Sequence, residues 1–302
     1  MSVVVEKRQG FGVIRIDHVA NLNALSPRVM TDLEAALADF ASDTDIRVIL
    51  ITGTGRAFSA GADIRYLASA SPDACRQYLG HAQNVLERIA SLSVPLIAIV
   101  NGVCTGGGCT LAGACDLAIA ADSTTFGEPE ARIGLPGGFG NVARLVRRVG
   151  IAVAAELLLT GRIIDASAAE RIGLVARVVP AAALWDEAEK LAAEIASSSP
   201  TAVAQIKRLL RGSNASGAAE IDAFMTCLID GEGREGMQAF LEKAPPQMVA
   251  PRNVIEALSN QKTPSSTPFH GLAWVTPNSS GAQRHRCWNG VVLERRMLER
   301  DA

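Results

Sequence analysis

The chain has 302 residues, of which 48% are apolar, and its formal net charge is −2. This length suits one large domain or two smaller ones, and the apolar share supports a sizeable core. A net charge near zero provides no electrostatic footprint for nucleic acid or an anionic membrane, and aromatic residues make up only 4% of the chain. We therefore expect neither nucleic acid nor a membrane among its partners.

The six cysteines and four histidines are scattered along the chain, and no two cysteines form a Cys-x-x-Cys pair. Cys104, Cys109 and Cys115 have small, apolar neighbours, where buried free thiols are usual. The first ten residues contain no apolar signal core, and no apolar run reaches the length of a membrane span. These features predict a cytoplasmic protein without a metal site.

The first half of the chain alternates apolar runs with amphipathic segments. Residues 11–17 alternate as a strand does, and a helix is predicted from Pro27. Its apolar stripe is Met30, Leu33, Leu37 and Phe40. Buried strands are predicted at 47–51, 95–100 and 117–120. Helices fit 72–90 and the segment after Gly106, so the order of strands and helices indicates an α/β fold with a parallel sheet.

From about Ala182 onward the pattern is only helical. One stripe consists of Leu184, Ala188, Leu191 and Ile195. A helix beginning at Pro200 has apolar Ile206, Leu209 and Leu210. Further helices are predicted at 218–229 and 233–243. We therefore divide the chain into an α/β core at 1–180 and a helical C-terminal region at 181–250.

Residues 251–302 differ in composition from the rest. Residues 263–268 are rich in turn formers, and residues 284–300 are basic and unperiodic. This composition predicts a disordered tail. A partner-binding extension is the alternative, with Trp274 and Trp288 in its favour.

Two segments of small residues each follow a predicted strand, at 57–64 and 101–110. In the second, Gly106-Gly107-Gly108 opens a helix, whose first amides have no partner within the helix. The helix dipole adds partial positive charge at this end. Two such amides that converge form an oxyanion hole, which suits the enolate of a thioester. Glycine-rich turns also serve close packing alone, and this alternative stays open.

A carboxylate beside such a hole could move protons on and off a neighbouring carbon. Glu128 and Glu130 are both candidates, and the residues alone do not decide between them. Either one could also be a solvated charge in the first turn of a helix. Thr110 lies three residues after Gly107 and therefore shares its helix face.

These segments, in this order and spacing, resemble the enoyl-CoA hydratase/isomerase (crotonase) superfamily. The resemblance covers roughly residues 3–250 and includes Asn23-Ala24-Leu25-Ser26 and the stretch 235–243. It implies a spiral of strand–strand–helix turns and a helical C-terminal region that promotes trimers or dimers of trimers. It also implies an acyl-CoA thioester as substrate, with coenzyme A present only as part of that substrate and no other cofactor.

The resemblance assigns roles to individual residues. Ala62 and Gly107 would supply the two oxyanion amides, and Glu130 would be the acid/base. Contacts to CoA or the acyl group would come from Ala60, Asp63, Ile64, Arg65, Leu135, Phe240 and Lys243. Phe240 and Lys243 belong to the helix that closes over CoA, sometimes from a neighbouring subunit.

The chain departs from the family pattern at Thr110, where hydratases usually carry their first glutamate. A threonine hydroxyl can hold a water but cannot take its proton at neutral pH. We therefore expect double-bond isomerisation with Glu130 as the only acid/base. A hydratase or hydratase-lyase that uses a water held by Thr110 is the alternative, and a non-catalytic CoA-binding protein is another. Thr110 could equally be inert, with its hydroxyl bonded back to the carbonyl one turn earlier.

Overall fold

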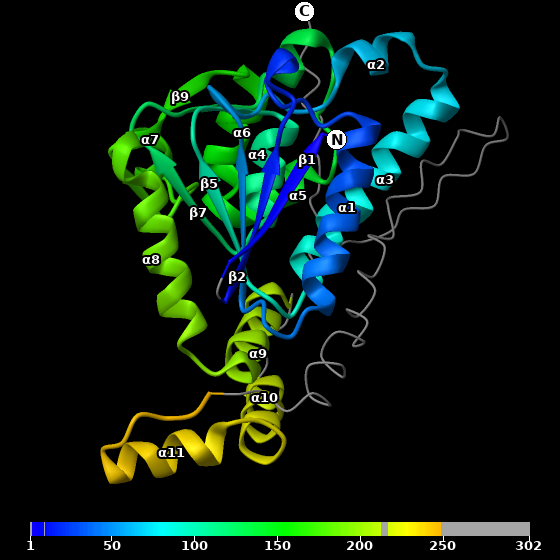
Figure 1. The fold of residues 1–302 in the computed structure, drawn as a ribbon. Helices are drawn as coiled ribbons and strands as arrows, with labels where there is room; N and C mark the ends of the chain where they lie inside the picture. The colour runs from blue at the N-terminus through cyan, green and yellow to red at the C-terminus, as the bar shows by residue number, and fades with distance from the viewer. Residues whose placement is uncertain (1, 9, 213–216, 249–302) are drawn as a thin grey trace, which may run out of the picture. The chain divides into compact units, whose positions relative to one another are not determined.

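The structure is a computed structural model that describes residues 2–8, 10–212 and 217–248 (Figure 1). All of these residues belong to one compact unit within 1–261. The predicted tail at 251–302 lies outside the described residues. The boundary near residue 180 stays a prediction.

A six-stranded sheet forms the centre of the unit, and only its first strand is antiparallel to its neighbour. In spatial order its strands are β1 (Val3–Arg8), β2 (Phe11–Ile16), β3 (Val48–Gly53), β5 (Leu96–Val100), β7 (Leu117–Ala121) and β10 (Arg177–Val179). The four predicted strands are confirmed as β2, β3, β5 and β7. The sequence did not indicate β1 or β10, because β1 is largely exposed and β10 has only three residues.

A second, smaller sheet contains β4 (Ala57–Ser59), β6 (Val103–Thr105), β8 (Thr125–Gly127) and β9 (Ile163–Asp165) in that order. The chain enters the large sheet and then the small one three times, as β3 and β4, β5 and β6, and β7 and β8. The sequence did not indicate β8, which contains Phe126 and Gly127. A strand of three residues is too short to show a period in the sequence.

The small sheet positions the candidate site. Its strands β4, β6 and β8 are parallel and adjacent, so their carboxyl ends meet at one edge. After these strands come α2 (Ile64–Ser69), α4 (Gly107–Ala114) and the short 3₁₀ helix η2 (Pro129–Ile133). Segments that are well separated in sequence are thereby brought side by side.

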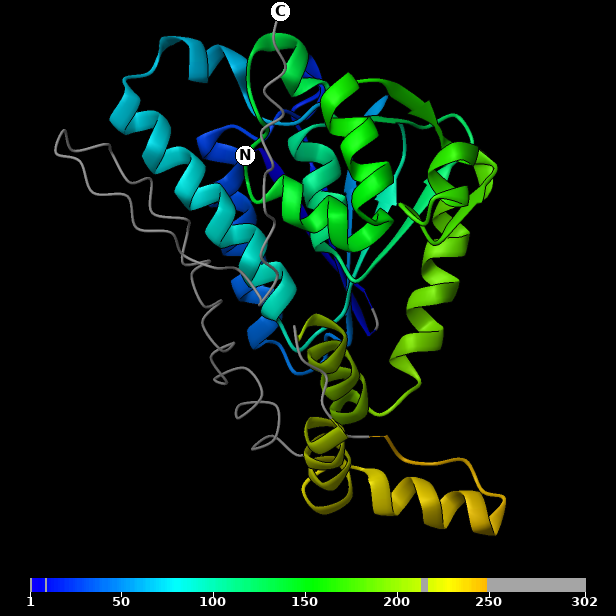
Figure 2. The same cartoon turned by 180° about the vertical axis from the view of Figure 1, so that it is seen from behind.

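Helices cover both faces of the large sheet. The helices α1 (Pro27–Ser42) and α3 (Pro72–Ser91) lie on one side and α8 (Leu184–Ala196) on the other (Figures 1 and 2). Alternate residues of β3 point to opposite faces, so Ile49 and Ile51 join the core under α1 and α3, while Leu50 packs under α8. This two-sided burial explains why the parallel strands appear in the sequence as continuous apolar runs.

Three helices begin with the same Ser-Pro pair. Ser26, Ser71 and Ser199 each accept a hydrogen bond from the backbone N–H three residues onward, and proline follows each of them. The hydroxyl satisfies one of the free amides of the first turn, and proline has no amide to lose there. The predicted helix starts at Pro27, Pro72 and Pro200 are therefore confirmed.

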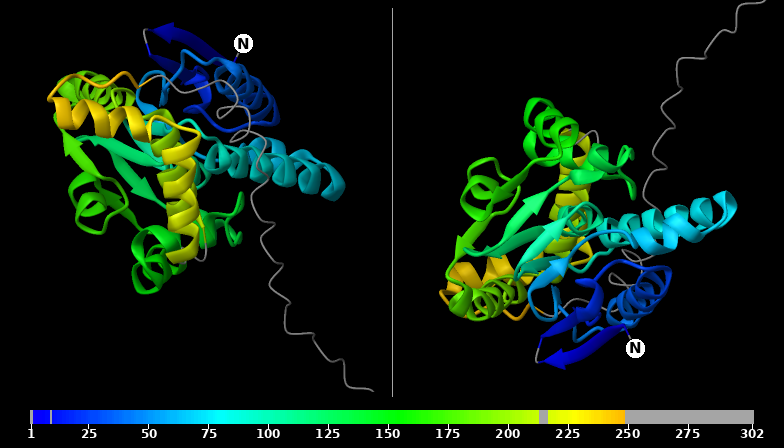
Figure 3. Two further views of the ribbon diagram at one scale, coloured as in Figure 1. Left: turned by 90° about the horizontal axis from the view of Figure 1, so that it is seen from below. Right: turned by 90° about the horizontal axis from the view of Figure 1, so that it is seen from above.

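The remaining helices are α5 (Asn141–Val149), α6 (Ile151–Thr160), α7 (Ala166–Arg171), α9 (Pro200–Arg211), α10 (Gly217–Ile229) and α11 (Gly233–Glu242), with short 3₁₀ turns η1 (Val19–Asn21) and η3 (Ala181–Ala183). The helix α10 contacts both α9 and α11, and α10 and α11 meet at a corner (Figure 3). On α9, apolar Ile206 and Leu210 are exposed while Lys207 is buried, the reverse of the predicted stripe. No helix in the described ranges is long and apolar enough to cross a bilayer.

Candidate functional site

Two backbone turns at the edge of the small sheet bring the amides of Ala62 and Gly107 together. The hydroxyl of Thr105 donates to the carbonyl of Ala60 over 3.2 Å and links the two turns. A methyl group added at Gly107 would lie 3.1 Å from the Ala62 nitrogen, and one added at Gly61 would lie 2.9 Å from the Gly107 nitrogen. Among the hydrogen bonds of the described residues, none uses the N–H of Ala62 or of Gly107. Two free amides this close together could both donate to one oxygen atom, as the predicted oxyanion hole requires.

Glycine is required at both turns. Gly61 has φ +96° and Gly106 has φ +52° with ψ −121°, conformations that side chains disfavour. A Cβ at Gly61 would also lie 2.7 Å from the carbonyl oxygen of Thr105. The glycines that the sequence singled out therefore allow the close approach of the two amides as well as the packing.

Glu130 lies on η2, directly against the second turn. A Cβ built on Gly106 would be 2.5 Å from the Glu130 Oε1 atom, so the carboxylate is next to the residue that precedes the Gly107 amide. Its Oε2 atom is buried and has no hydrogen-bond partner among the described residues. Burial raises the pKa of Glu130 above its ordinary value. A carboxylate with one free oxygen and a raised pKa beside two free amides can exchange protons with a bound molecule.

Glu128 is placed differently, although it is only two residues away. Its side chain is 3% exposed and accepts a hydrogen bond from Asn141 Nδ2 over 3.0 Å. Burial raises the pKa of Glu128 to about 11, so this carboxyl group is protonated at neutral pH. A protonated acid cannot accept a proton, and the structure therefore separates the two candidates that the sequence left open.

Thr110 is buried one turn into α4, at 2% exposure. Its hydroxyl donates to the carbonyl of Gly106 over 3.1 Å, one turn earlier. This is the back-bonded arrangement that the sequence allowed as one alternative. The hydroxyl hydrogen is thus engaged with the backbone, although the oxygen can still accept a hydrogen bond.

An aromatic group flanks the amides, and the sequence did not indicate it. Phe139 is 3% exposed, and a Cβ on Gly107 would lie 2.8 Å from its ring. The rings of Phe139 and Tyr78 meet edge to face at 5.6 Å, and those of Tyr78 and Tyr66 at 5.3 Å. The Tyr78 hydroxyl donates to the carbonyl of Leu25, so it is held by the backbone. No local signal marks such a group, because its members come from three separate elements.

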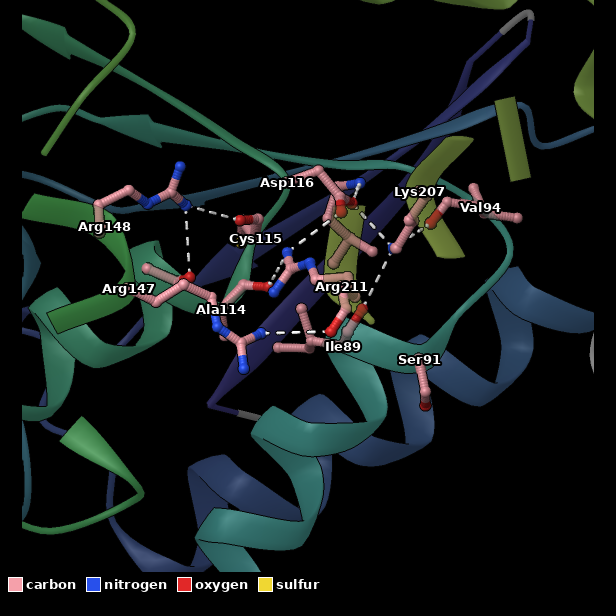
Figure 4. Close-up of polar contacts among 12 residues, drawn as sticks. Ile89, Ser91, Val94, Ala114, Cys115, Asp116, Arg147, Arg148, Lys207 and Arg211 are labelled. Carbon is pink, nitrogen blue, oxygen red and sulfur yellow. Dashed lines mark hydrogen bonds and ion pairs between the residues drawn. The ribbon is translucent and has the colours of Figure 1, made fainter. Parts of the chain in front are cut away.

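The other end of α4 is fastened by cationic side chains (Figure 4). Arg148 donates to the carbonyl of Cys115 over 2.9 Å, and Arg211 to that of Ala114 over 2.7 Å. Arg211 also binds Asp116, which pairs with the buried Lys207 at 2.8 Å. Cations at the carboxyl end of a helix satisfy its free carbonyls and favour its dipole. The helix that carries the Gly107 amide is thereby held at both ends.

The predicted CoA and acyl contacts fall in two places. Ala60, Ile64 and Arg65 are within three residues of Ala62 in the chain, and the Leu135 amide donates to the carbonyl of Glu130. Of these, Ile64, Arg65 and Leu135 are exposed. Asp63 has a structural task, since it accepts the amides of Arg65 and Tyr66 and caps α2.

Phe240 and Lys243 lie elsewhere in the chain. Both are exposed at the end of α11, with Phe240 at 83%. The helix α11 lies at the opposite end of the large sheet from α2 (Figures 1 and 2). Within one chain, the structure does not bring these two residues to the amides.

Comparison with known proteins identifies the family. The sequence profile described as Enoyl-CoA hydratase/isomerase matches residues 6–250. This chain belongs to the enoyl-CoA hydratase/isomerase family. It is therefore an enzyme with the crotonase fold, as the resemblance implied.

Several relatives share most of the chain. A probable enoyl-CoA hydratase of Mycobacterium tuberculosis is 39% identical over 252 residues, which cover 82% of this chain and 97% of the relative. A crotonyl-CoA hydratase of Syntrophomonas wolfei is 36% identical and covers 80% and 95%. The crystal structure of an enoyl-CoA hydratase from Bacillus anthracis superposes with a TM-score of 0.80 at 31% identity, covering 83% of this chain and all of that one. These relatives are named as hydratases and do not favour the predicted preference for isomerisation.

Proposed function

We propose that this enzyme adds water reversibly across the double bond of a 2-enoyl-CoA thioester. The observation that supports this most is the pair of free amides at Ala62 and Gly107 beside the unpaired carboxylate of Glu130. The names of the relatives point to the same reaction.

In the proposed mechanism the thioester oxygen accepts hydrogen bonds from the N–H groups of Ala62 and Gly107. The Glu130 carboxylate removes a proton from water as the water oxygen bonds to C3. The electrons of the C2–C3 double bond move onto the thioester, and the two amides stabilise the resulting enolate oxygen. Glu130, now protonated, returns the proton to C2, so one water is added and the carboxylate is restored.

Glu128 has a separate role in this proposal. As a neutral acid it holds Asn141, the first residue of α5, and so fixes the end of the loop at 134–140. It leaves Glu130 as the carboxyl group next to the amides that exchanges protons in this mechanism.

A second candidate reaction is isomerisation, in which Glu130 would take a proton from C2 and return it at C4. The observation that favours it is the engaged hydroxyl of Thr110, which leaves Glu130 without a second proton-transferring partner. Incubation with 2-butenoyl-CoA and with 3-hexenoyl-CoA, followed by the absorbance of the conjugated enoyl thioester, distinguishes the two. Loss of absorbance with the first substrate supports hydration, whereas a gain with the second and no change with the first supports isomerisation.

We also propose that the active form is a trimer or a dimer of trimers. Large apolar side chains are exposed on the C-terminal helices, namely Ile206, Leu210, Ile221, Phe224, Phe240 and Leu241. Burying such a surface between subunits would be favourable. It would also allow Phe240 and Lys243 to reach CoA bound to a neighbour, as one chain alone does not. Sedimentation equilibrium tests the assembly, and a monomer with full activity would contradict it. The cytoplasmic location remains a prediction from the sequence.

A further inference from the structure

The ring of Phe139 lies directly against the residue that supplies the second amide. A Cβ built on Gly107 would be 2.8 Å from the Cε2 atom and 3.0 Å from the Cδ2 atom of that ring. These are sub-van-der-Waals separations, so the ring occupies all of the space on this side of the Gly107 α-carbon. A thioester whose oxygen binds the Gly107 amide would therefore have this ring next to its carbonyl group.

The ring is also firmly positioned. Phe139 has φ +59°, a left-handed conformation that is costly for a bulky residue and persists only where its surroundings impose it. The surroundings here are the edge-to-face contact with Tyr78 and the nearly complete burial of the side chain. Tyr78 is fixed in turn, because its hydroxyl donates to Leu25 and accepts from the Asp63 amide. The ring is therefore not free to swing aside at little cost.

Phe139 is also one of the residues that line a cavity of about 640 Å³. Its walls are the residues 138–140 and the amino-terminal half of α3, which contributes Cys75, Leu79 and Gln83. The residue whose ring lies against the amide turn thus also borders this cavity. Removing the ring would free the space that it fills beside Gly107.

We propose that Phe139 determines the acyl-chain specificity of the enzyme by closing the acyl end of the site, which restricts the substrate to short acyl groups. This rests on the proposed acyl-CoA chemistry of the same site. An acyl chain of about four carbons ends before the ring, whereas a chain of ten carbons needs the space that the ring occupies. Each methylene that a pocket rejects changes kcat/KM by roughly 10-fold or more.

The test compares the natural chain with Phe139→Gly, which removes the ring and suits the left-handed backbone, and with Phe139→Leu as a milder variant. Leu79→Ala enlarges the same cavity but leaves the Phe139 ring in place, so it serves as the matched control. We measure kcat/KM for 2-butenoyl-CoA and 2-decenoyl-CoA, and Kd for the saturated butanoyl-CoA and decanoyl-CoA, whose binding needs no turnover. The natural chain and Leu79→Ala should prefer the short thioester by about 10-fold or more, and Phe139→Gly should reduce that preference at least about 10-fold.

Equal use and equal binding of both chain lengths by the natural protein would overturn the proposal, whether or not the variants fold. An unchanged preference in folded Phe139→Gly would overturn it as well. If no enoyl thioester is turned over but short-chain binding is preferred and depends on Phe139, the proposed reaction fails and the specificity role stands.

Discussion

The buried carboxyl group of Glu128 makes a quantitative prediction about stability. Its pKa is about 11 in the folded chain because burial disfavours the charged form, against an ordinary value of 4.5. Above pH 4.5 the unfolded chain loses this proton and the folded chain keeps it. The folded state therefore loses stability as pH rises, by about 1.4 kcal/mol per pH unit, until the pH reaches the folded pKa. At pH 7, about 2.5 units above the ordinary value, the cost is about 3 kcal/mol.

Glu128→Gln removes this cost and keeps the shape of the neutral acid. In the natural chain Asn141 Nδ2 donates to the Glu128 Oε2 atom over 3.0 Å, and the glutamine carbonyl can accept the same hydrogen bond. The variant should be more stable than the natural chain by about 3 kcal/mol at pH 7, and the difference should grow by about 4 kcal/mol between pH 5 and pH 8.

Urea unfolding at a fixed protein concentration, repeated at each pH, measures this difference. Glu194→Gln is the control, because Glu194 is exposed on α8 and its neutralisation should change stability by less than about 0.5 kcal/mol. Parallel stability curves for the natural chain and Glu128→Gln from pH 5 to pH 8 would refute the assignment of a buried neutral acid.

Three further predictions follow from the site and its support. Glu130→Gln should lower kcat on the order of 10²–10⁴-fold without unfolding the chain, and near-full turnover of this variant would exclude Glu130 as the base. In the natural chain, kcat/KM should fall as the pH drops through the raised pKa of Glu130. Gly106→Ala puts a Cβ 2.5 Å from the Glu130 carboxylate on a residue with φ +52°, so it should cost about 1–3 kcal/mol of stability and most of the activity. Gly113 lies on α4 with open space around its α-carbon, so Gly113→Ala should change neither urea unfolding nor kcat/KM. Lys207→Met removes the hydrogen bonds to the carbonyls of Ile89 and Val94 and one partner of the half-buried Asp116, and should cost about 1–3 kcal/mol in urea unfolding. Exposed Lys190→Met should change stability by less than about 0.5 kcal/mol, and equal effects of the two would contradict a structural role for Lys207.

Much of the fold was predictable from the sequence, because its signals are local. The buried stripe of α1 at Met30, Leu33 and Phe40 repeats with the helical period, and the Ser-Pro pairs mark helix starts. The runs that became β3, β5 and β7 are apolar on both faces, as covered parallel strands must be. The strands of the small sheet escaped prediction because three residues carry no detectable period.

The glycine-rich turns of the candidate site were also visible in the sequence, since glycine is required where two backbones come into contact. Their convergence was not, because it depends on the pairing of β4, β6 and β8. The same holds for Phe139, whose ring reaches Gly107 from a loop more than thirty residues away.

The two glutamates show most clearly what could not be predicted from the sequence. Glu128 and Glu130 are the same residue type, two positions apart, and the sequence could not rank them. Only tertiary structure buries the first beside Asn141 and leaves the second unpaired against Gly106. The sequence by itself determined the family, the order of the elements and the residues available for chemistry. The tertiary structure decided that Glu128 is buried as a neutral acid, that the Thr110 hydroxyl is bonded to the backbone and that the Phe139 ring lies against Gly107. Desolvation and contact depend on neighbours in space, which the sequence does not show.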